Sequence, residues 1–316
     1  MADDSLPIID IAPFLNRGSG SDAVVAQTNS ACLNTGFFVV TGHGVDPSVT
    51  ARLYGSARSF FDRGDAEKRA LAGQPLQVAG VGFAPLLDEA LAATQGVSTP
   101  GDIKESLNFG PRLEGSPWPA DPTGMREAFM AYFVEMEKLA RRLRQIFCAA
   151  IGLEADYFEP YFADHLSALR VINYPAQTVD PLPGQLRAGA HTDYGFMTIL
   201  RSEASAGGLQ VRRRDGEWID APAVANAFVV NIADAFMRWT NDTWVSTPHR
   251  VVNPPAQARG TARRQSIAFF VNPSKDTRIE CLKAFYPAAG APRYEPVTFG
   301  EYIDLKTKQA FGGARA

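Results

Sequence analysis

After Ala168 the sequence alternates short β-type runs with turn signals, and this alternation constrains the fold of the chain more than any other feature. The runs are, in order, ALRVINY, FMTIL, GLQVR, EWIDA, AFVVNI, HRVV and SIAFFVN. Many short strands at close spacing are typical of an antiparallel sandwich or barrel. Asp215-Gly216 lies between two of the runs and predicts a tight hairpin turn. The adjacent Arg212–Arg214 is therefore expected on a solvated hairpin rather than at an anion site.

The part of the chain before this region is richer in helix signals. The clearest is Gly124–Ile151, in which apolar residues recur at three- and four-residue steps, charged residues occupy the other face and Gly152 follows as a stop signal. Residues 72–122 are rich in glycine and proline and are expected to be mostly loop, with a strand near Lys104–Phe109. Further expected elements are strands at Leu6–Asp10 and Phe37–Thr41 and helices at Asp22–Gly36, Ser48–Phe61, Asp65–Leu71 and Phe299–Phe311.

These patterns predict a mixed, mainly β fold with four parts. We expect an N-terminal α/β region at 1–122, a supporting helical segment at 123–164, a β core at 165–274 and a C-terminal extension with a helix at 275–316. Trp239 and Trp244 are expected to pack in the core or under a lid rather than to stack on a ligand.

Composition places the chain among ordinary globular proteins. Hydrophobic residues make up 46% and charged residues 21%, which is enough apolar material for a sizeable core. The formal net charge of −3 gives no basic excess, so we expect neither nucleic acid nor a membrane as partner. The opening MADDSLPIID lacks the basic and apolar segments of a signal peptide. Cys32, Cys148 and Cys281 lack zinc-ligand spacing, so we expect free buried thiols and a cytoplasmic protein.

Two of the four histidines are candidate metal ligands. His191 and Asp193 are two residues apart in HTDYGFMTIL, so on an extended segment both side chains project from one face. His249, which opens HRVV, adds a second imidazole from another strand. Two histidines and one carboxylate with open positions suit Fe(II) that must also bind a co-substrate and dioxygen. Two merely structural histidines explain these residues equally well. His43, in a Gly-His-Gly turn, and His165 are expected to be structural and surface or capping residues.

An arginine and a serine favour the metal interpretation. Arg264 and Ser266 are again two residues apart, at the start of an apolar strand. A guanidinium beside a hydroxyl is a good seat for a carboxylate. An inward arginine also needs an anion, because burying an unpaired charge is costly. The combination indicates a dicarboxylic ligand with one end on the metal and the other on Arg264. Asn231 and Asp234 either orient strands near the metal or belong to a turn.

At this point the sequence resembles the isopenicillin N synthase-like branch of the Fe(II)/2-oxoglutarate-dependent dioxygenases. In the first half the resemblance lies in LPIIDIAPF, GFFVVTGHGV, SFFDRGDAEKRA and DIKESLNFG. In the core it lies in HTDYGFMTIL, GGLQVRRRDGEWIDA, NIADAFMRWTNDTWVSTPHRVV and RQSIAFFVNP. The resemblance implies a distorted double-stranded β-helix (jelly roll) with flanking helices. It also implies Fe(II) on His191, Asp193 and His249.

The same resemblance implies a seat for the co-substrate. The distal carboxylate of 2-oxoglutarate would meet Arg264 and Ser266, with help from Tyr174. Plant members usually carry an asparagine two residues before that tyrosine, where this chain has Ile172. Asn173 does not replace it, because neighbouring strand positions face opposite sides.

The implied activity couples oxidative decarboxylation of 2-oxoglutarate, with O2 as the second co-substrate, to hydroxylation, desaturation or ring closure of a small organic substrate. Phe270, Phe109 and Phe83 are the expected substrate contacts and lean towards an apolar or aromatic substrate. One alternative is an iron oxidase of the isopenicillin N synthase type, which uses no 2-oxoglutarate. Another is a non-catalytic small-molecule binding protein on the same fold. A zinc hydrolase is disfavoured, because no carboxylate is placed as a general base.

Overall fold

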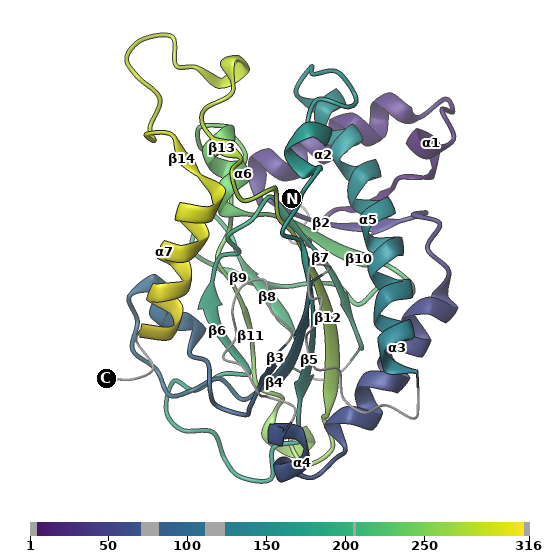
Figure 1. Ribbon diagram of the computed structural model, residues 1–316, viewed down its shortest axis with the longest axis vertical. Coiled ribbons are helices and arrows are strands. Elements are labelled where there is room, and N and C mark those ends of the chain that lie inside the picture. The colour runs from purple at the N-terminus through teal and green to yellow at the C-terminus, as the bar shows by residue number, and fades with distance from the viewer. Residues whose placement is uncertain (1–4, 71–81, 111–123, 205–206, 313–316) are drawn as a thin grey trace.

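Two β-sheets form the centre of the computed structural model, which describes residues 5–70, 82–110, 124–204 and 207–312 (Figure 1). The larger sheet has the strand order β1-β2-β10-β7-β12-β5-β4-β3 and the smaller one β6-β11-β8-β9. The strands are β1 (Ile8–Asp10), β2 (Phe37–Thr41), β3 (Gly82–Ala84), β4 (Glu105–Phe109), β5 (Ala168–Tyr174), β6 (Ala188–His191), β7 (Met197–Ser202), β8 (Leu209–Arg212), β9 (Trp218–Asp220), β10 (Phe228–Ile232), β11 (His249–Val251), β12 (Arg264–Val271) and a separate pair, β13 (Arg278–Ile279) and β14 (Val297–Thr298).

Helices cover the outside of this core. Figure 1 shows α2, α3 and α5 on one side of the molecule and α7 on the other. The α-helices are α1 (Ala12–Leu15), α2 (Ser21–Asn34), α3 (Pro47–Phe61), α4 (Asp65–Ala70), α5 (Met125–Ala150), α6 (Asp234–Trp239) and α7 (Phe299–Gly312), and the 3-10 helices are η1 (Leu91–Gln95), η2 (Glu159–Phe162), η3 (Ala256–Ala258) and η4 (Lys283–Phe285). The long helix α5 packs its apolar face on the larger sheet, with the rings of Phe133 and Phe269 5.0 Å apart.

Strand alternation gives the larger sheet two different faces. On β5, Leu169 and Val171 are buried in the core that includes α5. The alternate residues Arg170, Ile172 and Tyr174 line a cavity of about 200 Å³ instead. The smaller sheet forms the opposite wall of this cavity, through residues of β6, β8 and β11. The cavity therefore lies between the two sheets.

The expected fold class is confirmed. The chain has a mixed, mainly β fold in which two sheets face each other, an arrangement consistent with a double-stranded β-helix. The predicted hairpin is present, since β8 pairs with β9 in antiparallel register around Asp215-Gly216. Trp239 and Trp244 are buried in the core as expected. The segment 72–122 also holds β3 and η1, which its glycine and proline content had hidden, while its stretches 71–81 and 111–123 lie outside the described residues. Within the described ranges, no helix combines the length and the apolar character needed to cross a bilayer.

Candidate metal centre

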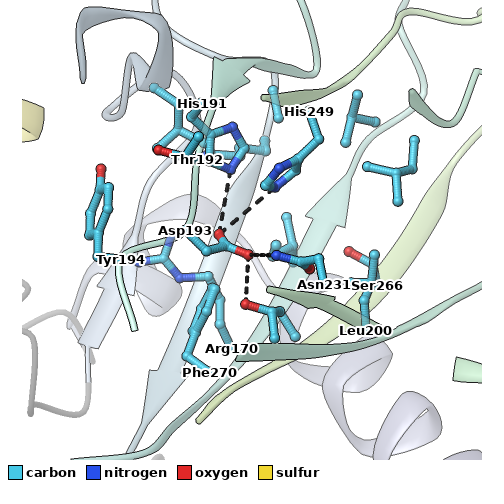
Figure 2. Close-up of a pocket in the computed structure, with 18 of the residues that line it drawn as sticks. Arg170, His191, Thr192, Asp193, Tyr194, Leu200, Asn231, His249, Ser266 and Phe270 are labelled. Atoms are coloured by element: carbon cyan, nitrogen blue, oxygen red, sulfur yellow. Dashed lines mark hydrogen bonds and ion pairs between the residues drawn. The ribbon is translucent and has the colours of Figure 1, made fainter. Parts of the chain in front are cut away.

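His191, Asp193 and His249 converge on one wall of the cavity (Figure 2). His191 and His249 are directly opposite each other in the antiparallel pairing of β6 with β11, so their rings lie 4.3 Å apart. Asp193 follows β6 by two residues, and its Oδ1 lies 4.0 Å from His191 Nε2 and 3.8 Å from His249 Nε2. One ligand atom from each of the three residues lies within 4.8 Å of the others. This donor set fits a single metal ion and leaves further coordination positions open.

Hydrogen bonds hold each of these ligand atoms in place. His191 Nδ1 is 2.8 Å from the carbonyl oxygen of Gly189, and His249 Nδ1 is 3.1 Å from that of Thr247. Because a carbonyl only accepts, each Nδ1 carries the proton and each Nε2 offers a lone pair to the metal position.

The carboxylate of Asp193 is held in the same way. Its Oδ2 accepts hydrogen bonds from Thr198 Oγ1 at 2.6 Å and Asn231 Nδ2 at 2.9 Å, which leaves Oδ1 for the ion. Thr198 and Asn231 are themselves partners across β7 and β10. The sheet register therefore builds this support.

Electrostatics keep the site in the form that binds metal. Burial lowers the pKa of His191 to about 3, and the charge of His249 acts in the same direction. The His191 ring is therefore neutral near pH 7. Burial raises the pKa of Asp193, but the two imidazoles and the hydrogen bonds from Thr198 and Asn231 outweigh it and lower that pKa.

The predicted anion seat lies in the same cavity. Arg264 is buried and donates to Ser202 Oγ and, at 3.3 Å, to the carbonyl oxygen of Glu203. Its Nη1 is buried and has no hydrogen-bond partner among the residues that the structure describes. Tyr174 is the cross-strand partner of Arg264, and its ring lies 5.2 Å from the guanidinium carbon. Ser266 also lines the cavity. A buried donor without a partner fits a carboxylate ligand at this end.

Of the predicted substrate contacts, the structure brings only Phe270 to the cavity. Phe109 packs on Phe129 of α5, with ring centroids 4.0 Å apart, and Phe83 packs on Phe60 of α3 at 5.6 Å. Neither ring reaches the cavity, so both expected contacts are corrected. Side chains alternate between the two faces along β4 and β3, and these two rings point to the helix-covered face. Of the three residues on which the preference for an apolar or aromatic substrate rested, Phe270 alone remains.

The remaining histidines and the Asn173 prediction agree with the structure. His43 is buried, and its Nε2 lies 2.7 Å from the carbonyl oxygen of Asn226, which is a structural role. His165 is half-buried and pairs with Glu137 at 2.8 Å. Ile172 lines the cavity, whereas Asn173 faces away from it and donates to Glu105.

The charged residues that line the cavity near Phe270 were not identified from the sequence. Arg170, Glu89 and Lys104 all line it. Arg170 was detectable, because it stands four residues before Tyr174 in ALRVINY and therefore shares its face. Lys104 begins the strand expected near Lys104–Phe109 and so shares a face with Asn108, whereas Glu89 lies in the segment rich in glycine and proline, where no periodic pattern assigns a face.

Comparison with known proteins identifies the family. The profile of the 2OG-Fe(II) oxygenase superfamily matches residues 166–273, and that of the N-terminal region of a non-haem dioxygenase in morphine synthesis matches residues 6–128. A 2-oxoglutarate-Fe(II) type oxidoreductase of Emericella nidulans is 32% identical, with 100% of this chain and 93% of that protein covered. The chain belongs to the 2OG-Fe(II) oxygenase superfamily.

Two further similarities within the superfamily involve named small molecules. Homoarginine-6-hydroxylase of Glycine max is 31% identical over 97% of each chain. The crystal structure of a full-length Neurospora crassa protein in complex with alpha-KG and thymine has a TM-score of 0.83 and 30% identity, covering 98% of each chain. The chain is thus an oxidoreductase that uses Fe(II) and 2-oxoglutarate, and its His-Asp-His cluster is an iron-binding triad.

Substitution of Thr198 by valine should weaken iron binding about 10- to 100-fold, as removal of an outer-shell partner usually does. Valine keeps the shape of the side chain but removes the hydroxyl that holds Asp193 Oδ2. Activity titrated against added Fe(II) measures the change. Thr28→Val is the matched control, because Thr28 is equally buried and its hydroxyl has no hydrogen-bond partner in the described part of the chain. Equal iron affinities in the two variants would contradict the role of Thr198.

Proposed function

We propose that His191, Asp193 and His249 hold Fe(II) and that Arg264, with Ser266 and Tyr174, binds the distal carboxylate of 2-oxoglutarate. The reaction is the oxidation of a C–H bond in a small organic substrate that binds beside Phe270. The observation that supports this most is the position of the triad on a cavity that also contains Arg264, whose buried Nη1 has no partner among the described residues.

The chain's own residues have separable tasks in this reaction. Bound Fe(II) and 2-oxoglutarate supply the activation of dioxygen for C–H oxidation. The triad offers ligand atoms from one side, so that the co-substrate and dioxygen find open positions. Arg264 orients the co-substrate by its distal carboxylate. Apolar side chains of the cavity wall keep water away from the reacting groups; they include Phe37, Leu91, Leu209 and Val251.

Oxygen consumption measured with and without 2-oxoglutarate tests the proposal. Iron is added back anaerobically to metal-free protein, and succinate and consumed O2 are then quantified. We expect both to require Fe(II) and 2-oxoglutarate together and to appear in equal amounts. Oxygen consumption without 2-oxoglutarate would instead indicate an oxidase of the isopenicillin N synthase type. Binding of ligands without any oxygen consumption would indicate a non-catalytic protein.

The substrate is a small polar molecule in this proposal. Thymine and homoarginine, which are named with two of the relatives, are both small but differ in charge. The choice between such classes therefore has to come from the cavity itself. We also propose a reducing, cytoplasmic setting, because Cys32, Cys148 and Cys281 are buried free thiols.

A further inference from the structure

A charged cluster lines the cavity beside Phe270. Lys104 Nζ is 3.0 Å from Glu89 Oε2 and 3.2 Å from Asp102 Oδ2, and Arg170 Nη1 is 3.2 Å from the same Glu89 oxygen. Arg170 Nε also donates to Asn108 Oδ1 at 2.5 Å. The side chains of Glu89, Lys104 and Asp102 are at most 5% exposed. Two cations and two anions therefore lie together, three of them buried and Arg170 at 18% side-chain exposure, and their formal charges cancel.

The sheet register places this cluster beside the reacting centre. Phe270 on β12 pairs with Thr198 on β7, and Thr198 pairs with Asn231 on β10. Thr198 and Asn231 both donate hydrogen bonds to Asp193, so Phe270 lies at the same height in the sheet as that carboxylate. Arg170 pairs with Asn108 and Ala268, one step along the sheet from Phe270 towards Arg264. Figure 2 shows Arg170, Phe270 and Tyr194 on one side of Asp193 and Ser266 on the other. A ligand held between Arg170 and Phe270 would therefore lie next to Asp193.

Three polar groups of the cluster are not used by the contacts described above. The hydrogen bonds and ion pairs of Arg170 use Nε and Nη1, and those of Glu89 use Oε2. These contacts do not use Arg170 Nη2, Glu89 Oε1 or Asn108 Nδ2. All three residues line the cavity. They offer a donor, an acceptor and a second donor in one small region.

The acceptor is an ionised carboxylate. Burial raises the pKa of Glu89, but the charges of Arg170 and Lys104 outweigh burial and lower the pKa to about 2. A carboxylate ligand on Arg170 would therefore lie beside a like charge. A cationic ligand on Glu89 would lie beside the Arg170 guanidinium, whose Nη1 is 3.2 Å from Glu89. A cluster of this kind disfavours both charged classes.

The shape of this part of the cavity favours a flat molecule. The Phe270 ring lies 5.8 Å from the guanidinium carbon of Arg170. Its neighbours on the cavity wall include two alanines, Ala168 on β5 and Ala268 on β12, which leave the space around the ring open. An aromatic face next to small side chains is a platform on which a planar ring stacks.

We propose that the prime substrate is a small, uncharged, planar heterocycle with a cyclic amide or imide edge. Its carbonyl accepts from Arg170, its ring N–H donates to Glu89, and a second carbonyl, where present, accepts from Asn108. Phe270 supports the ring. This inference rests on the proposed function, because it assigns the substrate of the same site.

Anaerobic calorimetric titration, with Mn(II) in place of iron and saturating 2-oxoglutarate, tests the proposal. The probes are thymine, 2-pyridone, 1,3-dimethylthymine, p-toluate and homoarginine. We expect the first two to bind at least about 10-fold more tightly than the others, the effect of one hydrogen bond to a charged group. Methylation of both nitrogens removes the N–H that Glu89 requires. Tightest binding of p-toluate or homoarginine, equal binding of thymine and its dimethyl derivative, or binding of none overturns the proposal.

A charge-neutralising variant sharpens the test. Glu89→Gln removes one negative charge from the cluster. The ratio of the Kd of p-toluate to the Kd of thymine should therefore fall by about 10-fold or more. Glu154→Gln, at an exposed position, is the control and should keep the wild-type ranking. An unchanged ranking in Glu89→Gln overturns the role of Glu89. Binding of 2-oxoglutarate is titrated first in every variant. Normal 2-oxoglutarate binding with another ranking refutes the substrate class alone, whereas failure of the wild type to bind 2-oxoglutarate refutes the proposed function as well.

Discussion

Replacement of Asp193 by alanine should reduce succinate formation to the level of metal-free enzyme. Asp193 is the only carboxylate of the triad, and its Oδ1 lies within 4.0 Å of both imidazole Nε2 atoms. Its loss removes the negative charge that compensates the ion and leaves the buried Thr198 and Asn231 without their acceptor. Because removal of an outer-shell partner alone costs about 10- to 100-fold, loss of the ligand should exceed about 100-fold.

Iron content and succinate release, measured on the same preparation, check this result. Asp276→Ala is the control, because Asp276 is exposed and far from the triad in sequence. Similar melting temperatures for the two variants would show that the fold is intact. Retention of stoichiometric iron and normal turnover by Asp193→Ala would remove Asp193 from the metal centre.

The residues of this centre could be predicted because they follow strand parity. His191 with Asp193, and Arg264 with Ser266, are pairs two residues apart, and such pairs share a face wherever the backbone is extended. The pairing of His191 with His249 across β6 and β11 could not be predicted in the same way. It depends on which distant strands become neighbours, and resemblance to a known family supplied that information.

The substrate end of the cavity shows where sequence patterns fail. Phe109 was expected as a contact because the resemblance places its N-terminal segment over the mouth of the site, yet its neighbour Asn108 occupies the inward position of β4. Glu89 lies outside regular structure, between β3 and η1, so no periodicity assigns its direction. Its burial follows from ion pairs with Lys104 and Arg170, which come from separate parts of the chain. Long-range charge pairing leaves no local signature.

Arg264→Gln should raise the KM for 2-oxoglutarate by roughly 30- to 1000-fold, which corresponds to about 2–4 kcal/mol for the loss of one partner from a buried charge pair. Glutamine still reaches a carboxylate oxygen but supplies neither the charge nor the two-pronged donor geometry. Because the proposed seat puts Arg264 and the triad at opposite ends of the co-substrate, kcat at saturating 2-oxoglutarate should change much less than KM. Initial rates of succinate formation over a wide range of 2-oxoglutarate concentration give both constants.

A graded series separates the guanidinium from the rest of the seat. Ser266→Ala removes one neutral hydrogen-bond donor and should raise the same KM only about 2- to 10-fold. Arg264→Lys keeps the charge, so its KM should lie between those of the wild type and Arg264→Gln. Arg212→Gln, at an exposed position on β8, should leave KM unchanged. If Arg264→Gln lowered kcat while KM stayed normal, the arginine would act on the reacting centre and the carboxylate seat would have to lie elsewhere.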